Sequence, residues 1–92
     1  MPKNTVFIGR KPVMVYVLAV MTAFKDNPAE VIIRARGRSI STAVDVAEVT
    51  KNNYLNDVTN TILIGTEKLE GEDGKSRNVS TIEITLRKSP GA

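Results

Sequence analysis

The fold is decided by one stretch of the sequence, TVFIGRKPVMVYVLAVMTAFKDNPAEVIIRA, which covers residues 5–35. Its β-rich run at residues 5–8 stops at Gly9 and predicts a first strand. The apolar run at residues 12–25 opens with a proline, which suits the first helical position because its missing N–H costs nothing there, and it predicts a helix. An Asp-Asn-Pro sequence ends this helix, and residues 29–35 predict a second strand.

A strand, a helix and a second strand in this order form a βαβ unit, in which the two strands run parallel. The ends of parallel strands meet at the same edge of a sheet, so the loops that follow them emerge on the same side of the molecule. Both loops are basic: Arg10 and Lys11 follow the first strand, and Arg36 and Arg38 flank Gly37 after the second. We call Arg10, Lys11, Arg36 and Arg38 the basic edge, and the topology predicts that its two halves converge.

Each half of the basic edge directly precedes a predicted helix. Positive charge at that place opposes the helix dipole, at a cost of roughly 0.3–1 kcal/mol for each exposed charge. A bound anion would remove this conflict, because the backbone N–H groups at a helix N-terminus also favour phosphate. The basic edge is therefore a candidate site for the phosphates of a nucleic acid, although each cluster taken alone is also compatible with an ordinary surface turn.

A second helix is predicted from Ser39 or Ser41, either of which can cap it, to about Asn52. The residues expected on its core side are Ile40, Ala43, Val44 and Ala47. Two apolar residues, Tyr54 and Leu55, follow the end of this helix. They predict either a contact tucked under the core or an exposed patch for self-contact.

The last part of the chain predicts a long hairpin over about residues 61–88 and a frayed tail at residues 89–92. Alternation of apolar and polar residues indicates strands at residues 61–69 and 79–87, and the polar segment between them carries the turn pair Asp73-Gly74. The base of the hairpin is apolar enough to join the sheet, whereas its tip should project as an arm that carries Lys75 and Arg77. The acidic residues of the tip, Glu70, Glu72 and Asp73, offset these charges, so a flexible solvated loop is the alternative.

Composition excludes several classes of function. The chain has 92 residues, a formal net charge of +3 and neither cysteine nor histidine, so it predicts one domain over residues 1–92 without thiol, imidazole or Cys/His zinc chemistry. We expect no enzyme, no cofactor, no metal and no small-molecule substrate. The one carboxylate pair, Asp45 and Glu48, fits a solvated helix face better than a metal-dependent nuclease. Oligomerisation is expected, because so small a core leaves apolar surface uncovered.

The distribution of charge, the length of the longest apolar stretch and the aromatic residues indicate which partners and which cell compartment to expect. Residues 1–38 contain seven basic and two acidic side chains, residues 39–74 two and seven, and residues 75–92 four and one, so the charge is segregated. The apolar stretch at residues 12–24 is shorter than the ~20 residues that cross a bilayer and predicts a core helix. No secretory signal pattern opens the chain, so an intracellular, cytoplasmic protein is expected. Phe7 and Phe24 are interpreted as core residues, which disfavours the stacking of unpaired bases.

Three motifs in order resemble the Alba family, the small basic chromatin proteins of archaea. They are IGRKPVM at residues 8–14, ARGRSIS at residues 35–41 followed by AVD at residues 43–45, and VSTIEI at residues 79–84. The resemblance implies an α+β two-layer sandwich of order β-α-β-α-β-β, similar to the C-terminal domain of a bacterial translation initiation factor. It also implies a homodimer that binds double-stranded DNA without strong sequence preference and coats or compacts it, in the cytoplasm and associated with the chromosome or nucleoid.

The resemblance also assigns roles to individual residues. It places the whole basic edge on the nucleic-acid face, gives Lys75 and Arg77 contacts in the minor groove, and gives Tyr54 with its neighbour Leu55 a contact between dimers. In the family the first residue of the basic pair is often a lysine open to acetylation; here that residue is Arg10, so only Lys11 is available for this modification. An RNA-binding role and a place in a ribonucleoprotein stay open as alternatives, since phosphate sites do not distinguish the two duplexes.

Overall fold

The computed structural model describes residues 4–26 and 28–89. Its elements follow one another in the predicted order β-α-β-α-β-β, with a short turn of helix on each side of the second helix. They are β1 (Thr5–Phe7), α1 (Val13–Lys25), β2 (Glu30–Arg36), a 3₁₀ turn (Gly37–Ser39), α2 (Ile40–Val49), a π-helical turn (Thr50–Tyr54), β3 (Val58–Glu70) and β4 (Ser76–Lys88). The α+β fold class predicted from the sequence is confirmed.

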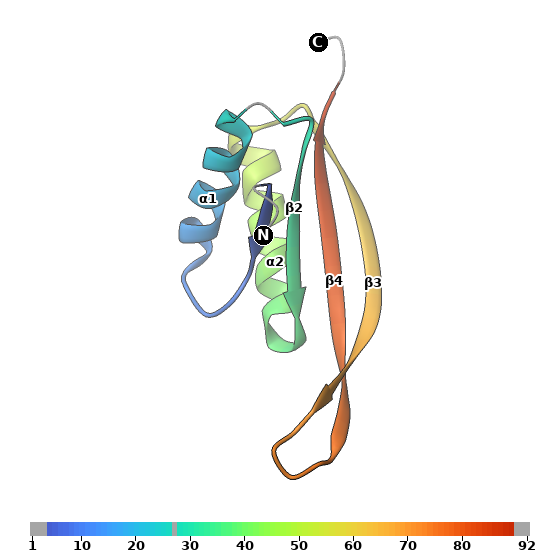
Figure 1. The fold of residues 1–92 in the computed structure, drawn as a ribbon. Coiled ribbons are helices and arrows are strands. Elements are labelled where there is room, and N and C mark those ends of the chain that lie inside the picture. The colour runs from blue at the N-terminus through green and yellow to red at the C-terminus, as the bar shows by residue number, and fades with distance from the viewer. Residues whose placement is uncertain (1–3, 27, 90–92) are drawn as a thin grey trace.

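The four strands form one sheet in the order β1-β2-β4-β3, in which β1 and β2 are parallel and the other neighbours antiparallel. Both helices lie on the same face of this sheet, so the molecule has two layers and its other sheet face is open (Figure 1). The core lies between the layers. It is built from alternate residues of the two central strands and from one stripe on each helix: Val31, Ile33, Ala35, Ile82, Ile84 and Leu86 from the strands, Val17, Val20 and Phe24 from α1, and Ala43, Val46 and Ala47 from α2.

The remaining apolar surface of α1 is only partly covered. Met14, Val15 and Leu18 are exposed, Leu18 to 60%. The described part of the chain contains no helix with the length and apolar character needed to cross a membrane. The sheet and α2 cover the buried side of α1, and part of the helix faces outward.

Three expectations about single residues are wrong. Phe7 is 48% exposed, because it pairs with Arg34 in the parallel ladder and therefore shares the open face of the sheet with that residue. Val44 is exposed and Val46 is buried, because the buried stripe of α2 runs through positions 43, 46 and 47 at the spacing of one helix face. Neither predicted serine caps α2: the 3₁₀ turn leads into the helix at Ile40, and Ser39 makes no side-chain cap bond.

The hairpin is longer than predicted and does project. Strands β3 and β4 pair from Val58 opposite Lys88 to Glu70 opposite Ser76, whereas β2 pairs with β4 only as far as Arg36 opposite Thr81. Residues 66–80 therefore have no third strand beside them; we call them the hairpin arm (Figure 1). The arm contributes to a molecule 52 Å long and 24 by 21 Å across.

The predicted turn closes the arm. Gly71 N–H donates to the carbonyl of Lys75 at 2.8 Å, and Gly74 N–H donates to the carbonyl of Gly71 at 3.1 Å. Gly74 has a φ of 78°, a left-handed conformation that glycine adopts without strain. Asp73 also has a structural task here, because its Oδ1 accepts a bond from Lys75 N–H at 3.0 Å. This acid is thus engaged with the turn backbone.

Candidate nucleic-acid interface

The loops that carry the basic edge lie next to each other, as the parallel strands predict. Ile8 N–H donates to the carbonyl of Arg34 at 2.9 Å, which continues the pairing of β1 and β2 past the end of β1. Ser39 Oγ, in the turn before α2, donates to the carbonyl of Gly9 at 3.4 Å. The starts of α1 and α2 therefore lie together at one end of the helical layer, the end from which the hairpin arm projects (Figure 1).

The first of these loops is held by a buried tyrosine from the first turn of α1. Tyr16, 7% exposed, accepts hydrogen bonds at its Oη from the N–H groups of Gly9 and Lys11, each at 2.9 Å. A Cβ on Gly9 would lie 3.3 Å from the same Oη, so glycine permits this close approach. The signal in the sequence was the hydroxyl itself, since a buried tyrosine usually finds a partner for it.

Three cations of the basic edge are exposed and have no acidic partner among the residues that the structure describes. Residues 4–26 and 28–89 form three ion pairs within 4.0 Å, and none of these involves Arg10, Lys11 or Arg38. Both helices begin without a side-chain cap and without an acidic residue in the first turn. At these starts Val15 N–H already donates to the carbonyl of Pro12, and Ile40 N–H donates to the carbonyl of Gly37. What the site offers a phosphate group is therefore the three cationic side chains, with no acidic side chain in the first turn of either helix to compete for them.

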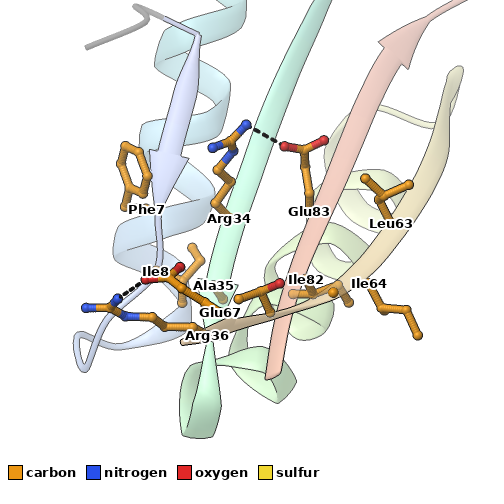
Figure 2. A pocket seen from close by; sticks show the side chains of 12 residues that line it. Phe7, Ile8, Arg34, Ala35, Arg36, Leu63, Ile64, Glu67, Ile82 and Glu83 are labelled. Atoms are coloured by element: carbon orange, nitrogen blue, oxygen red, sulfur yellow. Dashed lines mark hydrogen bonds and ion pairs between the residues drawn. The ribbon is translucent and has the colours of Figure 1, made fainter. Parts of the chain in front are cut away.

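Arg36 is placed differently from the rest of the basic edge. It is the last residue of β2, its side chain lies on the open face of the sheet, and its Nη1 lies 2.8 Å from Oε1 of Glu67 on the hairpin arm (Figure 2). The pair borders an open hollow of about 600 Å³ on this face, which is also lined by Phe7 and Leu63. A second ion pair, Arg34 with Glu83 at 2.6 Å, lies within the same hollow.

The two remaining residues that are predicted to contact DNA lie near the tip of the arm. Lys75 and Arg77 are exposed, as is Lys68, a third cation of the arm and not one of the predicted contacts. Lys68 lies opposite Asn78 in the β3–β4 ladder, and its position in a predicted strand was the only signal for it. The arm therefore presents three cations beyond the end of the body, among acids of which Asp73 is engaged in the turn.

The two apolar residues after α2 have separate positions. Leu55 packs against the core and its N–H donates to the carbonyl of Thr50 at 2.8 Å. Tyr54 is 48% exposed. Of the two interpretations, the core contact therefore describes Leu55, whereas the side chain of Tyr54 is accessible for a contact with another molecule.

The carboxylates of α2 lie on its exposed side. Glu48 Oε2 accepts a hydrogen bond from Asn52 Nδ2 at 3.2 Å, and Asp45 is exposed. Among the residues that the structure describes, no three acidic side chains lie close enough together to hold a metal ion.

Comparison with known proteins finds one family throughout. The family model described as Alba matches residues 4–68. The DNA/RNA-binding protein Alba of Thermoplasma volcanium is 53% identical over 85 residues, which are 91% of this chain and 94% of the relative. The DNA/RNA-binding protein Alba 1 of Archaeoglobus fulgidus is 54% identical over 89 residues, which are 96% of this chain and 99% of the relative.

Solved structures agree with these sequence relatives. The structure of Alba from Thermoplasma volcanium superposes with a TM-score of 0.85 at 52% identity and covers 92% of this chain and 100% of that chain. The crystal structure of ALBA1 from Trypanosoma brucei has a TM-score of 0.74 at 28% identity and covers 99% of this chain and 74% of that chain.

Proposed function

The chain belongs to the Alba family, and we propose that it binds double-stranded DNA without strong sequence preference, through phosphate contacts, and coats or compacts it as a dimer. The observation that carries this proposal is a set of three exposed cations at two adjacent helix starts that lack side-chain caps. None of the three belongs to an ion pair within the described parts of the chain. Two relatives named as DNA/RNA-binding proteins support the same chemistry. Contacts of this kind read the backbone and not the bases, so they carry no sequence preference.

The hairpin arm fits a second contact with the same duplex. It projects from the end of the body at which the basic edge lies (Figure 1), and Lys75 and Arg77 are exposed near its tip. Proteins that read DNA with β-ribbons place their strands in the major or the minor groove, and the family resemblance favours the minor groove. We assign the minor groove to the arm, with its cations against the backbones on either side.

A second copy of the chain accounts for apolar surface on β3. Ile62 and Ile64 pair with Ile84 and Ile82 and therefore face the helical layer, yet they are 56% and 79% exposed. They lie on an edge strand, so side chains from another molecule must cover them if they are to leave water. We propose that the homodimer does so, and that exposed Tyr54 joins one dimer to the next on DNA.

The proposed location of the protein is the chromosome or nucleoid within the cytoplasm. Lys11 is exposed on the basic edge, so its acetylation would remove one charge from the phosphate site and weaken binding. RNA is the second candidate ligand, because the names of two relatives include both nucleic acids. Contacts with 2′-hydroxyl groups would mark this alternative.

Titration by fluorescence anisotropy tests the proposal. Purified protein is added to labelled double-stranded DNA of several unrelated sequences, and to matched double-stranded RNA, at several salt concentrations. The proposal expects similar affinity for all DNA sequences and a steep loss of affinity with salt. A clear preference for RNA would favour the second candidate, and binding to neither would reject both.

Arg38→Ala identifies the surface involved. Loss of one phosphate contact lowers the slope of log K against log salt by about 0.9 for each protomer engaged, and affinity should fall equally for all sequences. Lys25→Ala is the matched control, because Lys25 is an exposed cation at the last turn of α1, at the opposite end of the helical layer (Figure 1). Equal effects of the two variants, or a loss confined to one sequence, would contradict the assignment.

A further inference from the structure

One ion pair joins the basic edge to the root of the hairpin arm. Arg36 ends β2 in the last row of the sheet in which three strands pair, opposite Thr81, which in turn lies opposite Gly65. Glu67 lies two residues beyond this row, where β3 has β4 alone as its neighbour. The 2.8 Å contact between Arg36 and Glu67 therefore links the body to the part of the hairpin that has no third strand.

The other two ion pairs of the described residues have a different geometry. Arg34 with Glu83 and Arg87 with Glu30 each join residues that lie directly opposite one another in the β2–β4 ladder. Both are held within the sheet, whose strands are fixed by their backbone hydrogen bonds. The Arg36–Glu67 pair alone among the three reaches past the last row of β2, to a residue that only the β3–β4 ladder holds.

This pair is open to exchange with solvent ions. The side chains of Arg36 and Glu67 are 58% and 48% exposed, so a phosphate oxygen can reach the guanidinium, and the released carboxylate remains hydrated. The planar guanidinium binds carboxylate and phosphate through the same fork of N–H donors. The carboxylate and a backbone phosphate therefore compete for the same donors.

We propose that Glu67 competes with nucleic-acid phosphate for Arg36, so that phosphate binding at the basic edge releases the root of the hairpin arm. This inference rests on the proposed function, because it takes Arg36 as a phosphate contact. Arg10, Lys11 and Arg38, which have no acidic partner in the described parts of the chain, bind the backbone first. Arg36 then exchanges Glu67 for phosphate, and the arm is free to follow the groove.

The first measurement compares the DNA affinities of Glu67→Gln and Glu30→Gln. Both variants remove one negative charge from an ion pair on the open face, but Glu30 pairs with Arg87, outside the basic edge. Exposed ion pairs stabilise by an amount equivalent to about a two- to fivefold change in an equilibrium constant. We expect Glu67→Gln to tighten DNA binding by about this factor beyond the effect of Glu30→Gln, and the excess to disappear in an Arg36→Ala background.

Other results of the affinity comparison would overturn the proposal. Equal tightening by the two variants would show a general effect of net charge and overturn the proposal. An excess that persists without Arg36 would show that Glu67 repels DNA directly, which also overturns it. If Arg36→Ala leaves affinity unchanged while Arg38→Ala lowers it, the proposal fails and the proposed function stands, whereas a wild-type protein that binds neither DNA nor RNA rejects both.

The release of the arm has its own readout. The chain contains no cysteine, so Lys25→Cys and Glu72→Cys, at the far end of α1 and in the arm turn, can carry two spin labels, with unlabelled protein in excess to isolate distances within one chain. We expect the distance distribution of the free protein to broaden or shift on adding DNA, and Glu67→Gln to produce the same change without DNA. A Glu67→Gln distribution identical to that of the free parent would show that Glu67 does not hold the arm.

Discussion

The replacement of Tyr16 by phenylalanine tests how the basic edge is built. The change removes one hydroxyl from a side chain that is 7% exposed and keeps the ring that packs in the core. Two backbone donors, the N–H groups of Gly9 and Lys11, lose their acceptor at 2.9 Å. A hydrogen bond of this kind contributes about 0.5–1.5 kcal/mol net, so the free energy of unfolding should fall by about 1–3 kcal/mol.

The second tyrosine of the chain supplies the matched control. Tyr54 is 48% exposed, and Tyr54→Phe removes the same atom, with an expected change within about 0.5 kcal/mol. Urea unfolding followed by circular dichroism, at one protein concentration for all variants because the protein is expected to dimerise, compares the two. For a domain of this size each kcal/mol lowers the melting temperature by roughly 4–8 °C.

Amide hydrogen exchange locates the effect. The N–H groups of Gly9 and Lys11 should exchange faster in Tyr16→Phe, while amides in the centre of β2 change only as far as global stability changes. If Tyr16→Phe is as stable as Tyr54→Phe and these two amides keep their protection, the hydroxyl does not hold the loop, and the account of how the loop is ordered is refuted.

Three further changes test other parts of the molecule. Thr50 is fully buried and its Oγ1 has no hydrogen-bond partner in the described structure, so Thr50→Val should raise stability by about 1 kcal/mol; a lower urea midpoint would contradict this. Gly74→Ala places a Cβ in open space at a φ of 78° and should weaken the turn by about 1 kcal/mol, more than Gly74→Asn, as faster amide exchange in the arm would show. Ile64→Asp should convert the dimer to a monomer in sedimentation, whereas Thr61→Asp, on the other face of β3, should not, and a dimer that survives Ile64→Asp would argue against that interface.

Local signals in the sequence were enough for the order of elements and for the place of the basic edge. Gly9 and the proline at position 12 mark the passage from strand to helix, and parallel strands bring the loops after β1 and β2 to one edge whatever the side chains do. The turn at Asp73-Gly74 is equally local, because the left-handed conformation at Gly74 depends on that residue alone. Each of these features needs information from a few neighbouring positions.

The face of the sheet or helix on which an individual side chain lies could be determined only from the assembled structure. β1 contains three residues, which is too short for alternation to show that Phe7 faces away from the helices. On α2, the rotation at which the helix packs on the sheet decides that Val46, and not Val44, lies in the core. Both positions are apolar, so hydrophobicity alone does not distinguish the buried one from the exposed one.

The contacts that organise the candidate site are set by register and by the path of the chain. Arg36 and Glu67 are 31 positions apart in the sequence, and they meet because the β2–β4 and β3–β4 registers place the end of β2 beside the root of the arm. Tyr16 meets the N–H groups of Gly9 and Lys11 because the loop turns back over the first turns of α1. Composition and periodicity indicate which residues are apolar and expected to be buried, and which are charged. The partner of each polar group depends on the geometry that forms when the sheet and helices have packed.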